Sequence, residues 1–229
     1  MPLIERERWT NVPGTDAYYP STPDELRVAY PEQREDDMGE TSIHIKLVTS
    51  LLWTLILFLK HRSDVFVSAN MNLYWEEGNP DRWLAPDLLV AFGVPAGERS
   101  IFQVWKEGVC PQVIVEVASK RTWRADVSDK LQVYSDLGVE EYYLLDPSFE
   151  FLPMPLMAFH REGERLIGTR IDNERILSKR LGLEIVRDEN TFRLFDPLKG
   201  EFLLTLDAAD ARIEELEAEI ARLRNRRND

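Results

Sequence analysis

A strand, a helix and a second strand near the middle of the chain constrain its fold more than any other feature. Val113–Ala118 is an almost continuous apolar run, as is typical of strands buried on both faces. A helix is expected from Arg124 to Leu137, with Gly138 well placed to end it. Glu141–Pro147 then follows as another strand. This order and spacing predict a βαβ-like unit with a parallel strand pair, and therefore an α/β fold.

A long apolar helix is expected earlier in the chain, over residues 40–60. Thr41 or Ser42 can cap its first turn by accepting bonds from N–H groups that would otherwise lack a partner. The helix is apolar nearly all round from its second turn, which indicates packing against a sheet. Its most apolar run, Leu51–Leu59, is far shorter than the roughly 20 residues that span a bilayer, so no membrane partner is expected. With a further buried strand at Leu88–Phe92, we predict a mixed central β-sheet flanked by helices.

The chain divides into three parts by composition. Residues 1–39 are polar and punctuated by prolines, which predicts an extended N-terminal arm with a short helix start at residues 24–27. Residues 40–205 hold the α/β domain, within which residues 93–111 are expected to form a loop-rich insertion. Residues 206–229 form a predicted C-terminal coiled-coil helix, whose apolar side chains recur at spacings of three and four: Leu206, Ala209, Ile213, Leu216, Ile220 and Leu223. This helix either pairs two chains into a homodimer or lies as a lone amphipathic helix on its own domain.

Charge and composition exclude several classes of function. The chain has 229 residues with 28 Lys and Arg against 41 Asp and Glu, a formal charge of −13. Contact with nucleic acid phosphates therefore requires a local basic patch or bound metal ions. One cysteine, Cys110, excludes a disulfide framework and fits a cytoplasmic location. The phosphate loop, the dinucleotide-binding glycine turn and the serine nucleophile elbow are all missing, so no nucleotide cofactor is expected.

Two carboxylates are placed where they can form a site. Glu116 interrupts an apolar strand, and a buried carboxylate is costly unless it is paired, protonated or bound to a metal. Asp87 directly precedes another buried strand. If the two strands are neighbours, the carboxylates converge at one edge of the sheet and form an oxygen site suited to Mg²⁺ or Mn²⁺. The alternatives are turn chemistry for Asp87 and pairing with an arginine for Glu116.

The order of motifs resembles the Uma-type family of restriction endonucleases, within the PD-(D/E)XK nuclease superfamily. The resemblance spans residues 40–205 and rests on a set of motifs in this order: Pro86-Asp87, Glu116-Val117-Ala118-Ser119, Asp126, Lys130, Tyr134, Gly138-Val139-Glu140-Glu141-Tyr142 and Asp146-Pro147. It implies a nuclease-like fold in which Asp87 and Glu116 bind the metal, with Glu40 as a third acidic ligand from the first helix. Glu40 can equally be an acid favoured by the helix dipole.

The resemblance also implies a catalytic lysine, and the chain departs from the superfamily at that point. Ala118 stands where a lysine usually follows the acidic residue by two positions. The resemblance therefore points to Lys130 on the following helix, with Lys120 as the nearer alternative. An ammonium there can stabilise the attacking hydroxide or the charge that develops on phosphorus. Alternatively, Asp126 and Lys130 form an ordinary exposed helix pair at positions i and i+4.

Other residues are candidates to line the site. They are His44, Ser119, Lys120, Asp126 and Tyr134, each of which also has an ordinary structural explanation. The cluster of Lys120, Arg121 and Arg124 follows Glu116 closely and can meet phosphates, or it can be a solvated loop.

Two functions follow from these observations. The first is a Mg²⁺- or Mn²⁺-dependent DNA endonuclease that uses Asp87, Glu116 and Lys130. The second is a catalytically inactive nuclease-fold module that acts in binding or assembly through its coiled-coil tail, which Ala118 and the acidic charge favour. No sequence feature separates DNA from RNA or from a small phosphoester as substrate.

Overall fold

The centre of the molecule is a six-stranded mixed sheet. The computed structural model describes residues 41–205, the backbone of 9–11 and 18–20, and residues 208–209, 215–218, 220 and 222. The order of the strands is β11-β10-β9-β8-β6-β3. β8 and β9 are parallel, as the βαβ-like unit predicts, and the other neighbours are antiparallel. The strands are β3 Val65–Ala69, β6 Leu88–Phe92, β8 Val113–Val117, β9 Glu141–Leu145, β10 Leu156–Glu162 and β11 Arg165–Thr169.

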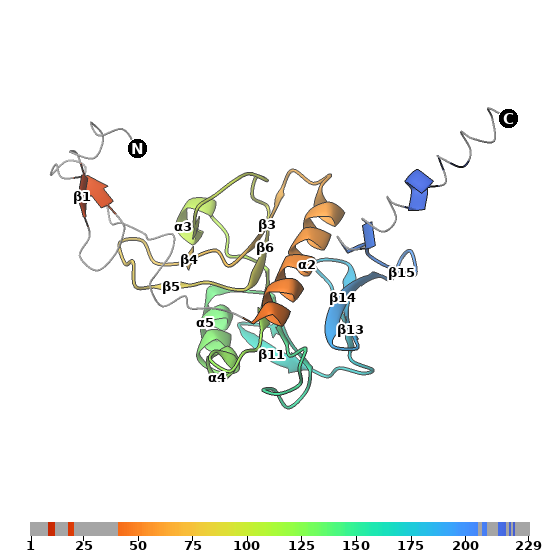
Figure 1. Ribbon diagram of the computed structural model, residues 1–229. Coiled ribbons are helices and arrows are strands. Elements are labelled where there is room, and N and C mark those ends of the chain that lie inside the picture. Colours follow the sequence, from red (N-terminus) through yellow and green to blue (C-terminus); the bar gives the residue numbers. More distant parts are fainter. Residues whose placement is uncertain are drawn as a thin grey trace.

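One face of this sheet is covered by the helix α2, Ser42–Leu59. Its N-cap is Thr41, whose hydroxyl accepts a hydrogen bond from the N–H of His44 at 3.3 Å, as expected for a helix that begins at this point. By length and composition alone α2 could cross a membrane, but seven of its side chains are buried in the protein. It lies between the central sheet and a second, four-stranded sheet (Figure 1). That sheet contains β12 Arg175–Ser178, β13 Leu183–Asp188, β14 Thr191–Asp196 and β15 Glu201–Phe202.

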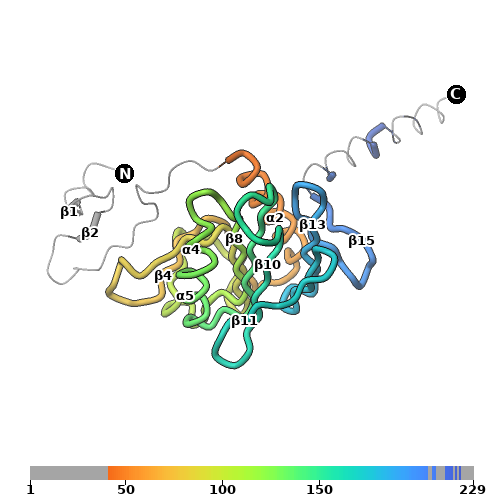
Figure 2. The backbone as a smooth tube through the Cα atoms, turned by 90° about the horizontal axis from the view of Figure 1, so that it is seen from below, coloured from red at the N-terminus to blue at the C-terminus, as the bar shows by residue number. Residues whose placement is uncertain are grey.

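The opposite face of the central sheet is covered by short helices and a small sheet (Figure 2). The helices are α3 Val104–Glu107, α4 Trp123–Asp126 and α5 Asp129–Leu137. The three-stranded sheet contains β4 Leu73–Tyr74, β5 Trp83–Leu84 and β7 Phe102–Gln103. Because both faces are covered, every residue of β8 and β9 is buried, which explains why their sequences are apolar runs rather than alternating patterns.

Two expected elements differ from the structure. The single helix predicted from Arg124 to Leu137 is divided into α4 and α5, because Ser128 leaves the helical conformation (φ −125°, ψ −86°). Its hydroxyl donates to the carbonyl of Arg124 at 2.7 Å, a local bond that competes with the helical pattern. The predicted end of the helix is confirmed, since Gly138 is its C-cap with φ +89°. The insertion over residues 93–111 is also more ordered than expected, because it contains β7 and α3.

The two ends of the chain are described only in part. At the N-terminus, β1 Trp9–Asn11 and β2 Tyr18–Pro20 form an antiparallel pair, and the helix start expected at residues 24–27 lies outside the described residues. In the C-terminal seam, Leu206, Ile213 and Leu223 lie outside them as well. Leu216 and Ile220 are described and are 41% and 48% exposed. Pairing through this seam stays a prediction.

Candidate active site

Asp87 and Glu116 meet at one end of the central sheet. β6 and β8 are antiparallel neighbours, with Leu88 opposite Val115, so the start of β6 lies beside the end of β8. The N–H of Asp87 donates to Oε2 of Glu116 at 3.4 Å, and the N–H of Val117 donates to Oδ2 of Asp87 at 2.6 Å. The expected convergence of the two carboxylates is therefore present. The bond from Val117 could not have been predicted, because a backbone contact leaves no pattern in the sequence.

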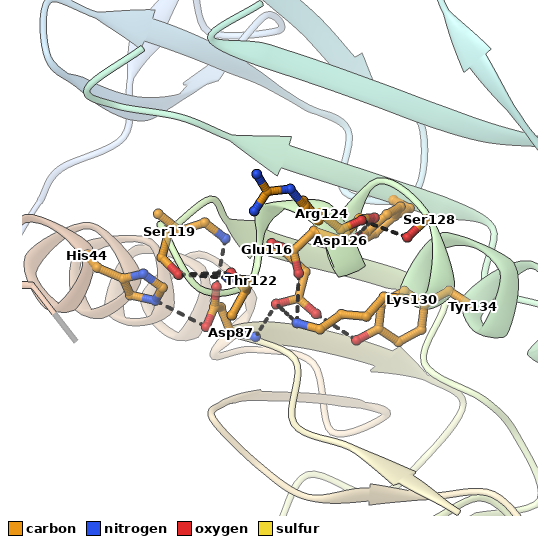
Figure 3. Close-up of polar contacts among 12 residues, drawn as sticks. His44, Asp87, Glu116, Ser119, Thr122, Arg124, Asp126, Ser128, Lys130 and Tyr134 are labelled. Atoms are coloured by element: carbon orange, nitrogen blue, oxygen red, sulfur yellow. Dashed lines mark hydrogen bonds and ion pairs between the residues drawn. The ribbon is translucent and has the colours of Figure 1, made fainter. Parts of the chain in front are cut away.

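The helix α5 places Lys130 and Tyr134 against Glu116 (Figure 3). Nζ of Lys130 lies 3.0 Å from Oε2 of Glu116 and 2.9 Å from Oδ1 of Asp126. The hydroxyl of Tyr134 donates to Oε1 of Glu116 at 2.7 Å. Lys130 and Tyr134 are four positions apart and so share one face of the helix. The alternative of an exposed helix pair is wrong, because the Lys130 side chain is only 15% exposed and Asp126 is fully buried.

His44 contacts Asp87 from the other layer of the molecule. It lies in the first turn of α2 and is 5% exposed. Its Nε2 is 3.1 Å from Oδ1 of Asp87 (Figure 3). Asp87 is thus held by an imidazole on one oxygen and by a backbone N–H on the other. These two contacts fix the orientation of the carboxylate.

The cluster contains more buried negative charge than positive charge. Asp87, Glu116 and Asp126 are 7%, 1% and 0% exposed. Lys130 pairs with Glu116 and Asp126. Burial raises the pKa of Glu116 to about 8; the Lys130 ammonium opposes this rise, and the charges of Asp87 and Asp126 add to it. Such a surplus favours a proton or a metal cation within the cluster.

The carboxylates of the cluster raise the pKa of both Lys130 and Tyr134. Burial by itself would lower the pKa of Lys130, but attraction to Glu116 and Asp126 outweighs burial and raises it. Lys130 therefore remains an ammonium at neutral pH. Burial and the neighbouring Glu116 carboxylate raise the pKa of Tyr134, which keeps the phenol neutral and able to donate its proton in a hydrogen bond.

Among the described residues, no hydrogen bond or ion pair joins the candidates Ser119 and Lys120 to the cluster. The Ser119 hydroxyl lies 3.0 Å from that of Thr122 and accepts the Thr122 N–H at 3.3 Å, so it closes the turn after β8. Lys120 is exposed on that turn. Glu40 lies outside the described residues, so its predicted role as a metal ligand stays a prediction.

Comparison with known proteins identifies the family. The model of the family Uma2, described as "Putative restriction endonuclease", matches residues 16–197. The chain belongs to the Uma2 family. One solved structure, described as a putative nuclease belonging to DUF820 from Anabaena variabilis ATCC 29413, is 12% identical with a TM-score of 0.47. That match covers 63% of this chain and 76% of the other. No curated protein matches the chain.

The Uma2 match includes every residue of the cluster, from His44 to Tyr134. Family membership supports a nuclease, and the cluster is the place in the described chain where acidic side chains and a buried lysine come together. A cavity of 660 Å³ lies elsewhere, between the end of α2, β3 and residues 96–100, and none of the cluster residues lines it. The cluster, rather than the cavity, is therefore the candidate site.

The oxygen atoms of the cluster suit a divalent cation. Within the part of the chain that the structure describes, no group of three or more His, Cys, Asp or Glu side chains is placed to hold a metal by itself. Mg²⁺ does not need such a cage, because it usually keeps several waters and is bound through one or two carboxylates. Oδ2 of Asp126 is also buried without a hydrogen-bond partner among the described residues. The surplus of negative charge and this oxygen fit a metal held by carboxylates and water.

Proposed function

We propose that this Uma2 protein is a Mg²⁺- or Mn²⁺-dependent endonuclease that hydrolyses phosphodiester bonds in DNA. The observation that supports this most is the burial of three carboxylates around one ammonium, at the end of two central strands. A core built only for stability does not favour this arrangement, because unbalanced buried charge is costly. A cation bound during catalysis would supply the missing positive charge.

Asp87 and Glu116 would hold the metal ion. When bound, such an ion polarises a phosphoryl oxygen and lowers the pKa of a water molecule. Hydrolysis then forms one bond from the water oxygen to phosphorus and breaks one bond from phosphorus to a sugar oxygen, which takes up a proton.

The protein side chains around the metal ligands have distinct tasks. Lys130 stays protonated, so it stabilises the negative charge that develops on the phosphate and does not act as a general base. Tyr134 and His44 orient the two metal-binding carboxylates through the contacts at 2.7 Å and 3.1 Å. In this division of roles, Lys130 would take the task of the superfamily lysine, whose usual position is occupied by Ala118.

The turn after β8 would bind the phosphate backbone of DNA. Lys120, Arg121 and Arg124 are exposed on this turn, which begins three residues after Glu116. The guanidinium of Arg124 lies over the ring of Trp123 at 4.6 Å, a contact that holds it at the surface. In a chain with a formal charge of −13, this local positive charge beside the cluster is suited to phosphates.

The test is cleavage of supercoiled plasmid and of single-stranded DNA with Mg²⁺ and with Mn²⁺. Wild type is compared with Asp87→Asn, Glu116→Gln and Lys130→Met. We expect the wild type to cut and each variant to lose on the order of a hundredfold or more in rate, as is typical when a group that stabilises the transition state is removed. Asp129→Asn is the matched control, because Asp129 is exposed on α5 beside Lys130 and should leave the rate unchanged.

The results separate the proposal from its rival. Ala118 in place of a lysine favours a catalytically inactive module, which would bind DNA or a partner without turnover. Failure of folded wild type to cut either DNA with either metal would support that module and would contradict the nuclease. Equal cutting by wild type and all variants would assign the activity to a contaminant. Cleavage that persists in Lys130→Met but is lost in Asp87→Asn and Glu116→Gln would move the lysine role elsewhere, with Lys120 as the next candidate.

A further inference from the structure

The outer face of α2 carries an apolar stripe that the domain does not cover. Ile45, Trp53 and Leu57 are 53%, 44% and 43% exposed. Their spacing of eight and four positions places them on one side of the helix, over a length of about 18 Å. Exposed apolar groups in a row of this kind are typical of interaction surfaces rather than of a solvated face.

The charged side chains of α2 and its C-cap have a single sign. α2 contains no aspartate and no glutamate, and Lys46 lies within it beside Ile45. Lys60 follows as the C-cap residue, and both lysines are exposed. The stripe therefore offers an apolar centre with a cation at each end. This arrangement favours an amphipathic helix that carries carboxylates beside its own apolar seam.

The C-terminal segment of the chain has that composition. Its seam is apolar, and residues 207–219 contain a single cation, Arg212, among six carboxylates: Asp207, Asp210, Glu214, Glu215, Glu217 and Glu219. Leu216 and Ile220 of the seam are 41% and 48% exposed, so they are not packed on their own domain.

The segment also leaves the domain beside α2. The hydroxyl of Thr54, in the middle of α2, donates to the carbonyl of Leu204 at 3.5 Å. Leu204 is itself an apolar residue that is 58% exposed. In two copies placed side by side, the tail of each therefore begins close to α2 of its own chain and within reach of α2 of the other.

We propose that the outer face of α2 is the docking surface for the acidic part, residues 207–219, of the C-terminal segment of a second copy of this chain. The docking is reciprocal, so that a homodimer contains two identical contacts between α2 and a tail. Pairing of two tails with each other is less favourable, because a seam of under three heptads is marginal in length. The α2 face supplies a partner that is already folded and has the opposite charge.

Sedimentation equilibrium of the full-length chain tests this proposal. We expect the wild type to dimerise and Trp53→Glu and Leu216→Glu each to weaken the dimer about tenfold or more. Ile45→Glu provides a second variant of the stripe, and circular dichroism shows whether each variant is folded. Ile167→Glu is the matched control, because Ile167 is 43% exposed on β11 and should leave dimerisation unchanged.

A mixture of two variants distinguishes this contact from the alternatives. In Trp53→Glu dimers both contacts contain a damaged α2, and in Leu216→Glu dimers both contain a damaged tail. A heterodimer of the two variants retains one intact contact, so mixing should restore part of the dimer. Dimerisation that is unaffected by Trp53→Glu would indicate pairing between tails, and dimerisation unaffected by Leu216→Glu would indicate pairing between α2 faces.

Either of those results would overturn the proposal, as would a mixture that remains monomeric or a wild type that is monomeric at all concentrations. A monomer in which Trp53→Cys and Leu216→Cys introduce thiols that cross-link within one chain would overturn it too, since the tail would then dock on its own α2. The native thiol does not interfere with that experiment, because burial raises the pKa of Cys110 to about 12 and keeps it protonated.

Discussion

Two buried glutamates on neighbouring strands have opposite surroundings. Glu116 near the end of β8 is 1% exposed, and Glu141 at the start of β9 is 3% exposed. Glu141 accepts hydrogen bonds from the hydroxyls of Tyr143 and Ser178 at 3.0 and 2.5 Å and from the N–H of Arg180 at 3.0 Å. All three donors are neutral groups, and no second carboxylate joins them in these contacts. Glu116 instead shares its surroundings with two further carboxylates and one lysine.

This comparison shows that burial of a carboxylate does not by itself indicate a functional site. The bonds to Glu141 join β9 to the end of β12, so this glutamate connects the two sheets. A closed set of neutral donors stabilises such a charge without any ligand. At Glu116 the unbalanced charge remains, and a cation is the simplest partner for it.

Nuclease activity should separate the two glutamates most clearly. Glu116→Gln should lower the rate of plasmid cleavage on the order of a hundredfold or more, since it removes a metal ligand in the proposed site. Glu141→Gln should leave the rate within a few-fold at a temperature where the variant is folded. Initial rates with Mn²⁺ measure both. A large loss of rate in folded Glu141→Gln would show that Glu141 is not purely structural.

The free energy of unfolding should fall more in Glu141→Gln than in Glu116→Gln. Glu141→Gln should lower the free energy of unfolding by about 2–4 kcal/mol, because three donors lose a charged acceptor in a buried place. Glu116→Gln should cost little or increase stability, since burial already favours the neutral form of this side chain. Urea denaturation in the presence of a chelator measures both values. Equal losses for the two variants would contradict the view that only Glu141 is structural.

Divalent cations should stabilise only proteins that keep the cluster intact. At about 100 times its Kd, Mn²⁺ should add about 2.7 kcal/mol to the wild type, seen as a rise in Tm of a few degrees. Glu141→Gln should show the same rise and Glu116→Gln should show none. A rise in all three proteins would place the cation elsewhere, and a rise in none would remove the support for metal binding.

Lowering the pH should slightly lower the free energy of unfolding through His160, which lies near Glu141. Burial lowers the pKa of His160, whose Nε2 lies 3.1 Å from the Tyr143 hydroxyl and whose Nδ1 lies 2.9 Å from the Thr169 hydroxyl. A histidine with a lowered pKa in the folded state contributes stability above its unfolded pKa of about 6.5, and that stability is lost as the pH falls. The loss should be under about 1 kcal/mol, because His160 is partly exposed. His160→Gln should remove this part of the pH dependence in urea titrations between pH 7 and 5.

The fold could be predicted wherever local pattern and burial agree. Runs of apolar residues identified β6, β8 and β9, and Gly138 identified the end of α5, because these features depend on backbone preference and on burial on both faces of a sheet. The break at Ser128 was missed. A serine inside an otherwise helical pattern can point to solvent or bond to the preceding turn, and the sequence does not decide between them.

Only part of the candidate site could be predicted from the sequence. Asp87 and Glu116 were candidates because each stands beside or within an apolar strand, and family resemblance added Lys130. That Asp126 is fully buried, and that His44 contacts Asp87 from the opposite layer, depended on how α2 and α5 pack around the sheet. Glu141 looked like an ordinary strand residue, because its donors Ser178 and Arg180 come from almost 40 positions away.

The α/β class, the parallel unit and the identity of the two candidate carboxylates could therefore be inferred from the amino-acid sequence. These follow from periodicity, turn chemistry and the rarity of acids in apolar strands, all of which are local properties. Which buried acids share their charge, and which are neutralised by hydrogen bonds, depended on the packing of the folded chain. That balance depends on side chains brought together from distant elements, and Coulomb interactions depend on distance in space rather than on separation along the chain.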